Sequence, residues 1–186
     1  MKITVYCGAS LGNHPAHQEA TKDLANWIVS NQHTLVYGGS RAGLMGLIAD
    51  SVLAQGGKAI GIMPKFLQER ELAHPALTEF VLVDTMAQRK AKMLELADAC
   101  IALPGGPGTL EEITEVYSWA RIGQNSSPCI FFNKQGFYNP VRQMYASMME
   151  AGFLTQTDFD KLLFSEDLAE IEAFIASYQA PLVRTY

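Results

Sequence analysis

Short apolar runs alternate with helical patterns along this chain of 186 residues, and no other feature limits its fold as strongly. The runs predict strands at residues 3–7, 34–37, 58–62, 80–83, 99–103, 128–133 and 162–165. Helical patterns fill the intervals at residues 15–29, 44–53, 86–97, 109–121, 138–151 and 168–178. Residues 64–78 are expected to form a polar loop or a broken helix. Repeated β–α units with almost continuously apolar strands predict a parallel sheet covered on both faces. We therefore expect a single α/β domain over residues 1–186, with a Rossmann-like, doubly wound sheet of about six to seven strands.

A strand, a glycine-rich turn and a helix follow one another between Ala99 and Arg121, and the turn reads PGGPG at residues 104–108. The first amides of a helix lack partners and its dipole favours negative charge, so this arrangement predicts an anion site. Glycines let a phosphate approach the backbone closely. Because Glu111 and Glu112 follow in the first turn, the stretch predicts chemistry on a phosphorylated substrate.

Three glycine loops, at residues 8–12, 38–46 and 105–108, are expected to meet at the carboxyl edge of the sheet, where open α/β sheets bind ligands. The second loop has the spacing Gly39-x-x-x-Gly43-x-x-Gly46, which differs from the dinucleotide-binding pattern G-x-G-x-x-G. Tight-turn and packing roles explain these three glycines as well as ligand contact does. The chain has no P-loop sequence.

The helix expected at Met86 begins with the capping-box pattern Thr85-x-x-Gln88. Arg89 and Lys90 follow in its second turn, where the helix dipole opposes cations. They form either a solvated basic face or a site in which one of them leans over the sheet edge toward a phosphate or a base. We favour the second interpretation, and Met86 shares that face.

Glu112 has a structural alternative, because Thr109-x-x-Glu112 is also a capping-box pattern. In that case its carboxylate would only bond the Thr109 amide. Glu111 and Glu112 are about 100° apart around a helix, so we do not expect both to face one substrate. Their spacing does not decide which one does.

Composition excludes several other classes of protein. The formal net charge of −5 argues against a nucleic-acid-binding surface. No apolar run approaches the about 18 residues of a membrane span, and the first run is too short for a signal peptide. Cys7, Cys100 and Cys129 lie in or beside expected strands, which favours reduced core cysteines in a cytoplasmic protein. The pair His14 and His17 has no metal-binding motif around it, so we expect no metal.

The segment PGGPGTLEE at residues 104–112 resembles the P-G-G-x-G-T-x-x-E signature of the Lonely Guy (LOG) family, cytokinin-activating phosphoribohydrolases that are often labelled lysine decarboxylases. Met86-x-x-Arg89-Lys90 is similar to the second motif of that family, and residues 6–10, 37–39 and 43–46 resemble its first two loops. The likeness covers nearly the whole chain. Nothing in the sequence suggests the pyridoxal-phosphate lysine that a decarboxylase would need.

The resemblance implies hydrolysis of the N-glycosidic bond of an adenosine 5′-monophosphate, usually N6-substituted, by a homodimer that uses no metal or cofactor. It implies that Arg89 and Glu112 are the catalytic pair. The residues that it places around the phosphate are Gly105, Gly106, Gly108 and Thr109. The further substrate-binding residues that we expect are Gly8, Ser10, Gly39, Met86, Lys90 and Glu111.

The chain departs from the family pattern at three places: Ser40 replaces a glycine, Ala87 a histidine, and Pro107 a large residue. We expect the changes at Ser40, Arg41 and Ala87 to affect base specificity more than activity, and Pro107 to stiffen the phosphate loop without removing the amides of its glycines. The departures leave open a non-catalytic nucleotide- or cofactor-binding carrier, or another nucleotide or phosphosugar hydrolase. Retention of both Arg89 and Glu112 favours the phosphoribohydrolase, because a carrier does not need the two together.

Overall fold

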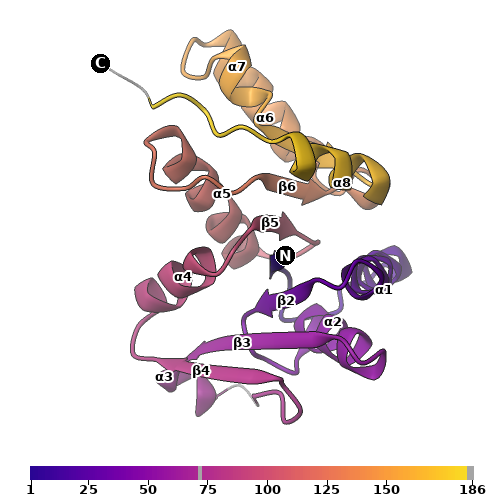
Figure 1. Ribbon diagram of the computed structural model, residues 1–186. Coiled ribbons are helices and arrows are strands. Elements are labelled where there is room, and N and C mark those ends of the chain that lie inside the picture. The colour runs from indigo at the N-terminus through magenta and orange to yellow at the C-terminus, as the bar shows by residue number, and fades with distance from the viewer. Residues whose placement is uncertain (71–72, 184–186) are drawn as a thin grey trace.

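The computed structural model describes residues 1–70 and 73–183, and within them seven parallel strands form one sheet (Figure 1). The strands are β1 (Lys2–Tyr6), β2 (Thr34–Tyr37), β3 (Lys58–Pro64), β4 (Glu79–Val83), β5 (Ala99–Ala102), β6 (Cys129–Phe132) and β7 (Leu162–Ser165). Their order across the sheet is β4-β3-β2-β1-β5-β6-β7, and every neighbouring pair is parallel. The predicted α/β fold is confirmed.

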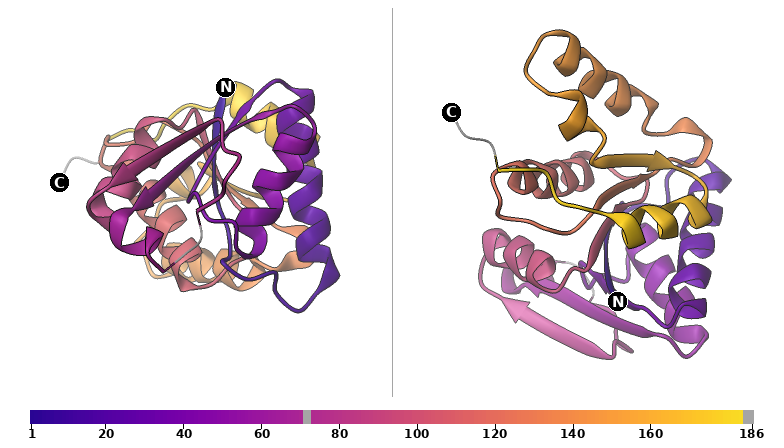
Figure 2. Two further views of the ribbon diagram at one scale, coloured as in Figure 1. Left: turned by 90° about the horizontal axis from the view of Figure 1, so that it is seen from below. Right: turned by 45° about the horizontal axis from the view of Figure 1, so that its top comes forward.

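Helices cover both faces of this sheet, as Figure 2 shows from two further directions. One face carries α1 (Pro15–Ser30), α2 (Gly43–Ala54) and α8 (Leu168–Ser177). The other carries α4 (Met86–Glu95), α5 (Pro107–Arg121) and α6 (Asn139–Glu150). Three short elements complete the described chain: α3 (Lys65–Gln68), the 3₁₀ turn η1 (Lys134–Gly136) and α7 (Gln156–Phe159). None of the helices in the described ranges is long and apolar enough to cross a membrane.

Alternate strand residues enter two separate cores, one beneath each helical layer. In β1, Ile3 and Val5 pack toward α1 and α2, whereas Tyr6 packs toward the α4–α5 side. Both sides of each central strand are therefore buried, which explains why these strands are apolar throughout. The three cysteines are free and buried in these cores, as the sequence predicts.

The order of the strands reverses between β1 and β5, and the two loops that follow these strands meet there. The amide of Gly8 donates a hydrogen bond to the carbonyl of Pro104 (3.1 Å). The third loop joins them, because the amide of Leu44 donates to the carbonyl of Gly8 (3.0 Å). Gly43 has a φ of +56°, and a Cβ there would lie 2.3 Å from the carbonyl carbon of Ala9. The predicted meeting of three glycine loops is confirmed.

The first turn of α5 differs from the prediction. The helix begins at Pro107, with Gly106 as its N-cap, rather than at Thr109. Proline is favoured at the first helical position because the amide that it lacks would have no partner there. The Thr109–Glu112 capping box, the structural alternative for Glu112, therefore does not form, and the Glu112 carboxylate does not cap this helix.

The capping box that the sequence predicts at the start of α4 is confirmed. The amide of Gln88 donates to Thr85 Oγ1 (3.1 Å), and the amide of Thr85 donates to Gln88 Oε1 (3.3 Å). These bonds set where α4 starts, and therefore which side chains of its first two turns face α5.

Candidate active site

A cavity of about 310 Å³ opens at the carboxyl edge of the sheet, between α4 and the first turn of α5. Its size falls in the usual range of small-ligand sites. Its lining residues are Cys7, Gly8, Ala9, Met45, Leu67, Met86, Arg89, Gly106, Gly108, Thr109, Glu111 and Glu112. Most of the residues predicted to form the site are thus brought together at the point where the strand order reverses.

The N-terminus of α5 forms one wall of this cavity. Gly108 and Thr109 lie in its first turn, so their amides have no acceptor within the helix, and Pro107 has no amide to offer. A Cβ at Gly106 or Gly108 would meet no atom within 4 Å. The backbone here is therefore open to a ligand, and the helix dipole favours an anion.

Gly105 has a different role in the same turn. A Cβ at Gly105 would lie 2.1 Å from Thr109 Oγ1 and 3.0 Å from the amide nitrogen of Gly8. This glycine lets the turn pack under Thr109 and against the loop after β1. It lines a neighbouring cavity of about 240 Å³ with Ser10, and Gly8 and Gly106 line both cavities.

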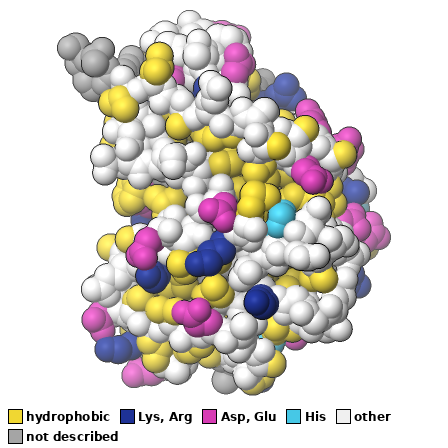
Figure 3. Space-filling model, in the orientation of Figure 1, with side chains coloured by type: hydrophobic (Ala, Val, Ile, Leu, Met, Phe, Trp, Pro, Cys, Tyr) yellow, Lys and Arg dark blue, Asp and Glu magenta, His cyan; other side chains and the backbone are white. Residues whose placement is uncertain are grey.

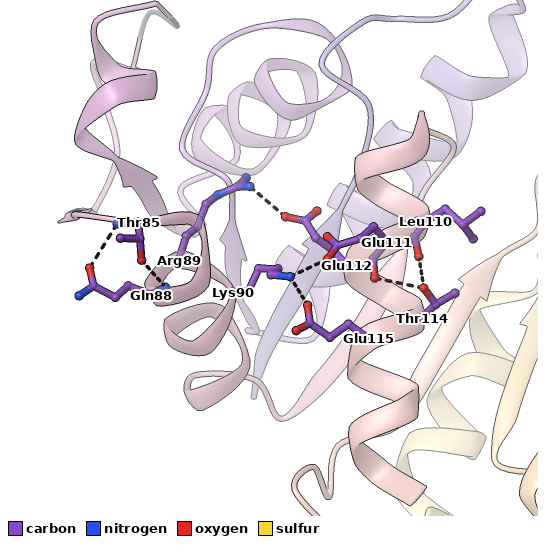
Figure 4. A network of polar contacts seen from close by, with 9 residues as sticks. All are labelled: Thr85, Gln88, Arg89, Lys90, Leu110, Glu111, Glu112, Thr114 and Glu115. Carbon is purple, nitrogen blue, oxygen red and sulfur yellow. Dashed lines mark hydrogen bonds and ion pairs between the residues drawn. The ribbon is translucent and has the colours of Figure 1, made fainter. Parts of the chain in front are cut away.

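Arg89 from α4 and Glu112 from α5 point toward one another (Figure 4), and both line the 310 Å³ cavity. Arg89 Nη1 donates to Glu112 Oε1 at 2.9 Å, and the two side chains are only 11% and 10% exposed. Arg89 Nε also donates to the carbonyl of Ile62 in β3 (3.2 Å). Arg89 therefore leans over the sheet edge, as predicted.

The electrostatics of Glu112 result from two opposing effects. Burial raises the pKa of its carboxyl above the ordinary value of 4.5, and the Arg89 guanidinium opposes that rise. The thiol of Cys7 and the phenol of Tyr6 stay neutral, because burial raises the pKa of each and the nearby Glu112 carboxyl adds to the effect. A carboxyl with a raised pKa in a cavity is typical of a residue that performs acid–base chemistry.

Lys90 points along α5 rather than into the cavity that Arg89 and Glu112 line. Its Nζ donates to Glu111 Oε1 at 2.6 Å and forms a second ion pair with Glu115 (Figure 4). These carboxylates raise the pKa of Lys90. Glu111 and Glu112 both line the cavity, against our expectation, but they bind different cations: Lys90 holds Glu111, and Arg89 holds Glu112. The ion pairs of Lys90 tie α4 to α5.

The second glycine loop serves packing more than the cavity. Gly39 lines neither cavity; it has a φ of +79°, and a Cβ there would lie 3.4 Å from the Gly61 carbonyl carbon. A Cβ at Gly46 would lie 2.0 Å from the carbonyl oxygen of Arg41. All three departures from the family pattern lie outside the cavity lining: Ser40 is buried, its Oγ accepting from the Ala42 amide (3.1 Å), and Ala87 and Pro107 are exposed.

Four cavity residues were not predicted: Cys7, Ala9, Met45 and Leu67. Ala9 lies in the first glycine loop and Cys7 directly before it, and Met45 lies in the first turn of α2 between Gly43 and Gly46. Leu67 belongs to the four-residue helix α3, which is too short to give a periodic pattern. With Met45 and Met86, it adds apolar surface to a cavity that also holds the polar groups of Arg89, Thr109, Glu111 and Glu112.

A cytokinin riboside 5′-monophosphate phosphoribohydrolase of Arabidopsis thaliana is 40% identical to this chain over 177 residues, which cover 95% of the chain and 82% of that protein. The chain belongs to the LOG family. A protein of the same description from Rhodococcoides fascians is 38% identical over 180 residues, covering 96% of this LOG-family chain and 89% of that protein. A family model described as possible lysine decarboxylase matches residues 45–174.

The fold of this LOG-family chain also resembles that of a solved structure of the Moco carrier protein from Chlamydomonas reinhardtii. The TM-score is 0.70 and the identity 17%, over 95% of this chain and 98% of the other. At that identity the likeness concerns the fold alone. Within the described ranges, no three His, Cys, Asp or Glu side chains are grouped in a way that could hold a metal ion.

Proposed function

We propose that this LOG-family protein hydrolyses the N-glycosidic bond of adenosine 5′-monophosphates, either N6-substituted cytokinin nucleotides or AMP. The products are the free base and ribose 5-phosphate. The observation that carries the proposal is the buried Arg89–Glu112 pair, which lines the same cavity as the open helix terminus at Gly106 and Gly108. The names of the Arabidopsis and Rhodococcoides relatives support the same reaction.

The residue types fit each part of this reaction. When the bond from C1′ to the base breaks, its electron pair leaves with the base and positive charge develops on the ribose ring. The Glu112 carboxylate stabilises that charge and accepts a proton from the water whose oxygen bonds to C1′. The departing base takes up a proton to balance the reaction. Arg89 keeps Glu112 ionised and attracts the phosphate or the leaving base as a fixed positive charge.

The 5′-phosphate lies, in this proposal, against the first turn of α5. The amides of Gly108 and Thr109 and the dipole of α5 suit its negative charge. Gly8 and Ser10, from the loop after β1, form the facing side of the two adjoining cavities. The apolar side chains of Met45, Leu67 and Met86 suit the base, and Met86 belongs to the predicted substrate-binding set.

Gly106→Val tests the position of the phosphate. Gly106 has an extended backbone (φ −91°, ψ −163°) that valine also adopts, and its Cβ would enter open space, so the variant should fold normally. The valine side chain would occupy the space in front of this turn and push the phosphate away from the amides of Gly108 and Thr109. Loss of one charge-assisted hydrogen bond in this way raises the KM for AMP about tenfold or more. Steady-state kinetics and thermal melting check this, with Gly105→Ala as a contrast that should lower the Tm. An unchanged KM for AMP in the folded Gly106→Val protein would show that the phosphate does not bind at this turn.

The direct test of the function is base release. We would incubate the pure protein, with a chelator present, with AMP and with N6-isopentenyl-AMP, and separate the products by chromatography. Free base and ribose 5-phosphate from either nucleotide, and their loss in Glu112→Gln, are the expected result. Nucleotide binding without base release would contradict the proposal and favour a carrier. A parallel panel of guanine and pyrimidine nucleotides tests the remaining alternative, because release only from one of these would indicate another hydrolase.

We further propose that the protein works as a cytoplasmic homodimer without a nucleic-acid or membrane partner. An apolar groove between α5 and α6, which includes the exposed Met144 together with Leu110 and Met148, supports an association between copies. On the face in Figure 3, positive and negative side chains are interspersed among the described residues, without a broad basic area. Light scattering should give twice the chain mass of 20.4 kDa.

A further inference from the structure

Gly38 directly follows β2, at the sheet edge over which Arg89 leans. A Cβ at Gly38 would lie 2.1 Å from Arg89 Nη2, 3.2 Å from Arg89 Cζ and 2.9 Å from Met45 Sδ. A carbon atom does not fit at these distances without displacing its neighbours. Gly38 does not have a left-handed φ, so its backbone conformation does not require glycine. The space above Gly38 is instead occupied by the guanidinium.

The other glycines of the same loop differ from Gly38 in what surrounds them. Gly39 and Gly43 have φ values of +79° and +56°, and a Cβ at Gly46 would meet the backbone of Arg41 at 2.0 Å. Substitution at these three positions strains the backbone or forces it to move. At Gly38 the nearest atoms are the far ends of two flexible side chains, Arg89 and Met45, which can turn aside without a shift of the backbone.

The guanidinium of Arg89 is fixed on three sides. Nε donates to the carbonyl of Ile62 at 3.2 Å, Nη1 donates to Glu112 at 2.9 Å, and Nη2 lies against Gly38. We propose that Gly38 is a positioning residue for the reaction: its missing side chain leaves the space through which Arg89 reaches Glu112. This inference rests on the proposed function, in which Arg89 and Glu112 act together.

Gly38→Ala is the experiment that follows. A displaced guanidinium should lower kcat/KM by about 10- to 100-fold, since misplacement by about 1 Å can have an effect of that size. The Tm should fall less than in Glu112→Ala, because both charged groups remain and the displaced guanidinium can be solvated through the cavity. A crystal structure of the variant should place Arg89 Nη1 beyond hydrogen-bond distance, more than about 3.5 Å, from Glu112 Oε1.

The pH profile of Gly38→Ala separates positioning from a general weakening of the fold. The groups that face Glu112 are Arg89 and Lys90 from α4, Glu111 and Glu115 from α5, and Tyr6 and Cys7 at β1. Of these, the substitution displaces only Arg89, which lowers the pKa of Glu112. The acid limb of the kcat/KM profile should therefore move to higher pH.

Two further variants complete the test. Gly57 directly precedes β3, at the amino edge of the sheet, and a Cβ there would lie 2.8 Å from Val29 Cγ2 and from Val52 Cγ1. The first variant is Gly57→Ala. It should lower the Tm and leave kcat/KM and the pH profile unchanged. The second variant is Arg89→Lys, in which the side chain has no Nη2 to face Gly38. Adding Gly38→Ala to Arg89→Lys should therefore change kcat/KM less than twofold relative to Arg89→Lys alone.

Several results would overturn the inference. One is a Gly38→Ala protein with the wild-type pH profile and the wild-type kcat/KM. Another is a crystal structure of that variant in which Arg89 has not moved. A third is a double variant, Gly38→Ala with Arg89→Lys, in which the losses of kcat/KM of the two single variants multiply. If Gly38→Ala folds poorly, Arg89→Lys should restore the Tm, and a failure to restore it also counts against the inference. These outcomes differ from failure of the proposed function, in which the wild-type protein itself releases no base. The crystal structure tests the position of Arg89 in either case.

Discussion

Glu112→Gln should lower the turnover number by about 10² or more, as expected when a charge that stabilises a transition state is removed. The fold should survive, because glutamine has the same shape and its side-chain oxygen can still accept the hydrogen bond from Arg89 Nη1. The measurements are kcat for base release and the Tm from calorimetry. Near wild-type turnover in this variant would remove Glu112 from the catalytic assignment.

Two comparison variants make that result specific. Glu115→Gln carries the same substitution one turn along α5, where the carboxylate pairs with Lys90 and does not line the cavity. It should leave kcat nearly unchanged. Glu112→Ala leaves the Arg89 guanidinium buried without its partner, and breaking a buried pair in this way costs about 3–5 kcal/mol. A loss of activity in Glu112→Gln accompanied by a fall in Tm like that of Glu112→Ala would indicate a structural role.

The sheet could be predicted from sequence because each strand is a short apolar run between polar or glycine-rich segments. The strands at residues 34–37 and 162–165 have the predicted ends, and the others differ by one or two residues. The short elements α3, η1 and α7 could not be predicted, since three or four residues give no measurable periodicity. At α5 two start signals compete, and the proline at position 107 decides the outcome over the capping preference of Thr109.

The site was predictable only in part, because its arrangement depends on how separate elements pack. Helix geometry separates Glu111 from Glu112 but does not say which one faces α4. The answer comes from the packing of α4 against α5, which brings Arg89 to Glu112 and Lys90 to Glu111. The role of Gly38 is similarly invisible in the sequence, since it depends on a side chain 51 positions away in the chain.

Arg89→Ala should lower kcat/KM by about 10²-fold and also change its dependence on pH. Arg89 lowers the pKa of Glu112, and burial raises it. Without the guanidinium, burial acts unopposed by that charge, so the carboxyl needs a higher pH to ionise. The acid limb of the kcat/KM profile, which reports the free enzyme, should therefore move upward. An unchanged acid limb would show that Arg89 does not control the charge of Glu112.

The same substitution should make stability depend on pH in a defined direction. A raised pKa in the folded protein, compared with about 4.3 in the unfolded chain, means that the folded state binds the proton more tightly. The stability gained from this proton is fully present below the unfolded pKa and is lost as pH rises through the folded pKa. The difference in Tm between Arg89→Ala and the wild type should thus be smaller near pH 5 than at pH 8. A Tm difference that grows toward acid pH would contradict this prediction. It would mean that other groups keep the Glu112 carboxylate ionised in the folded variant, although Arg89 is absent.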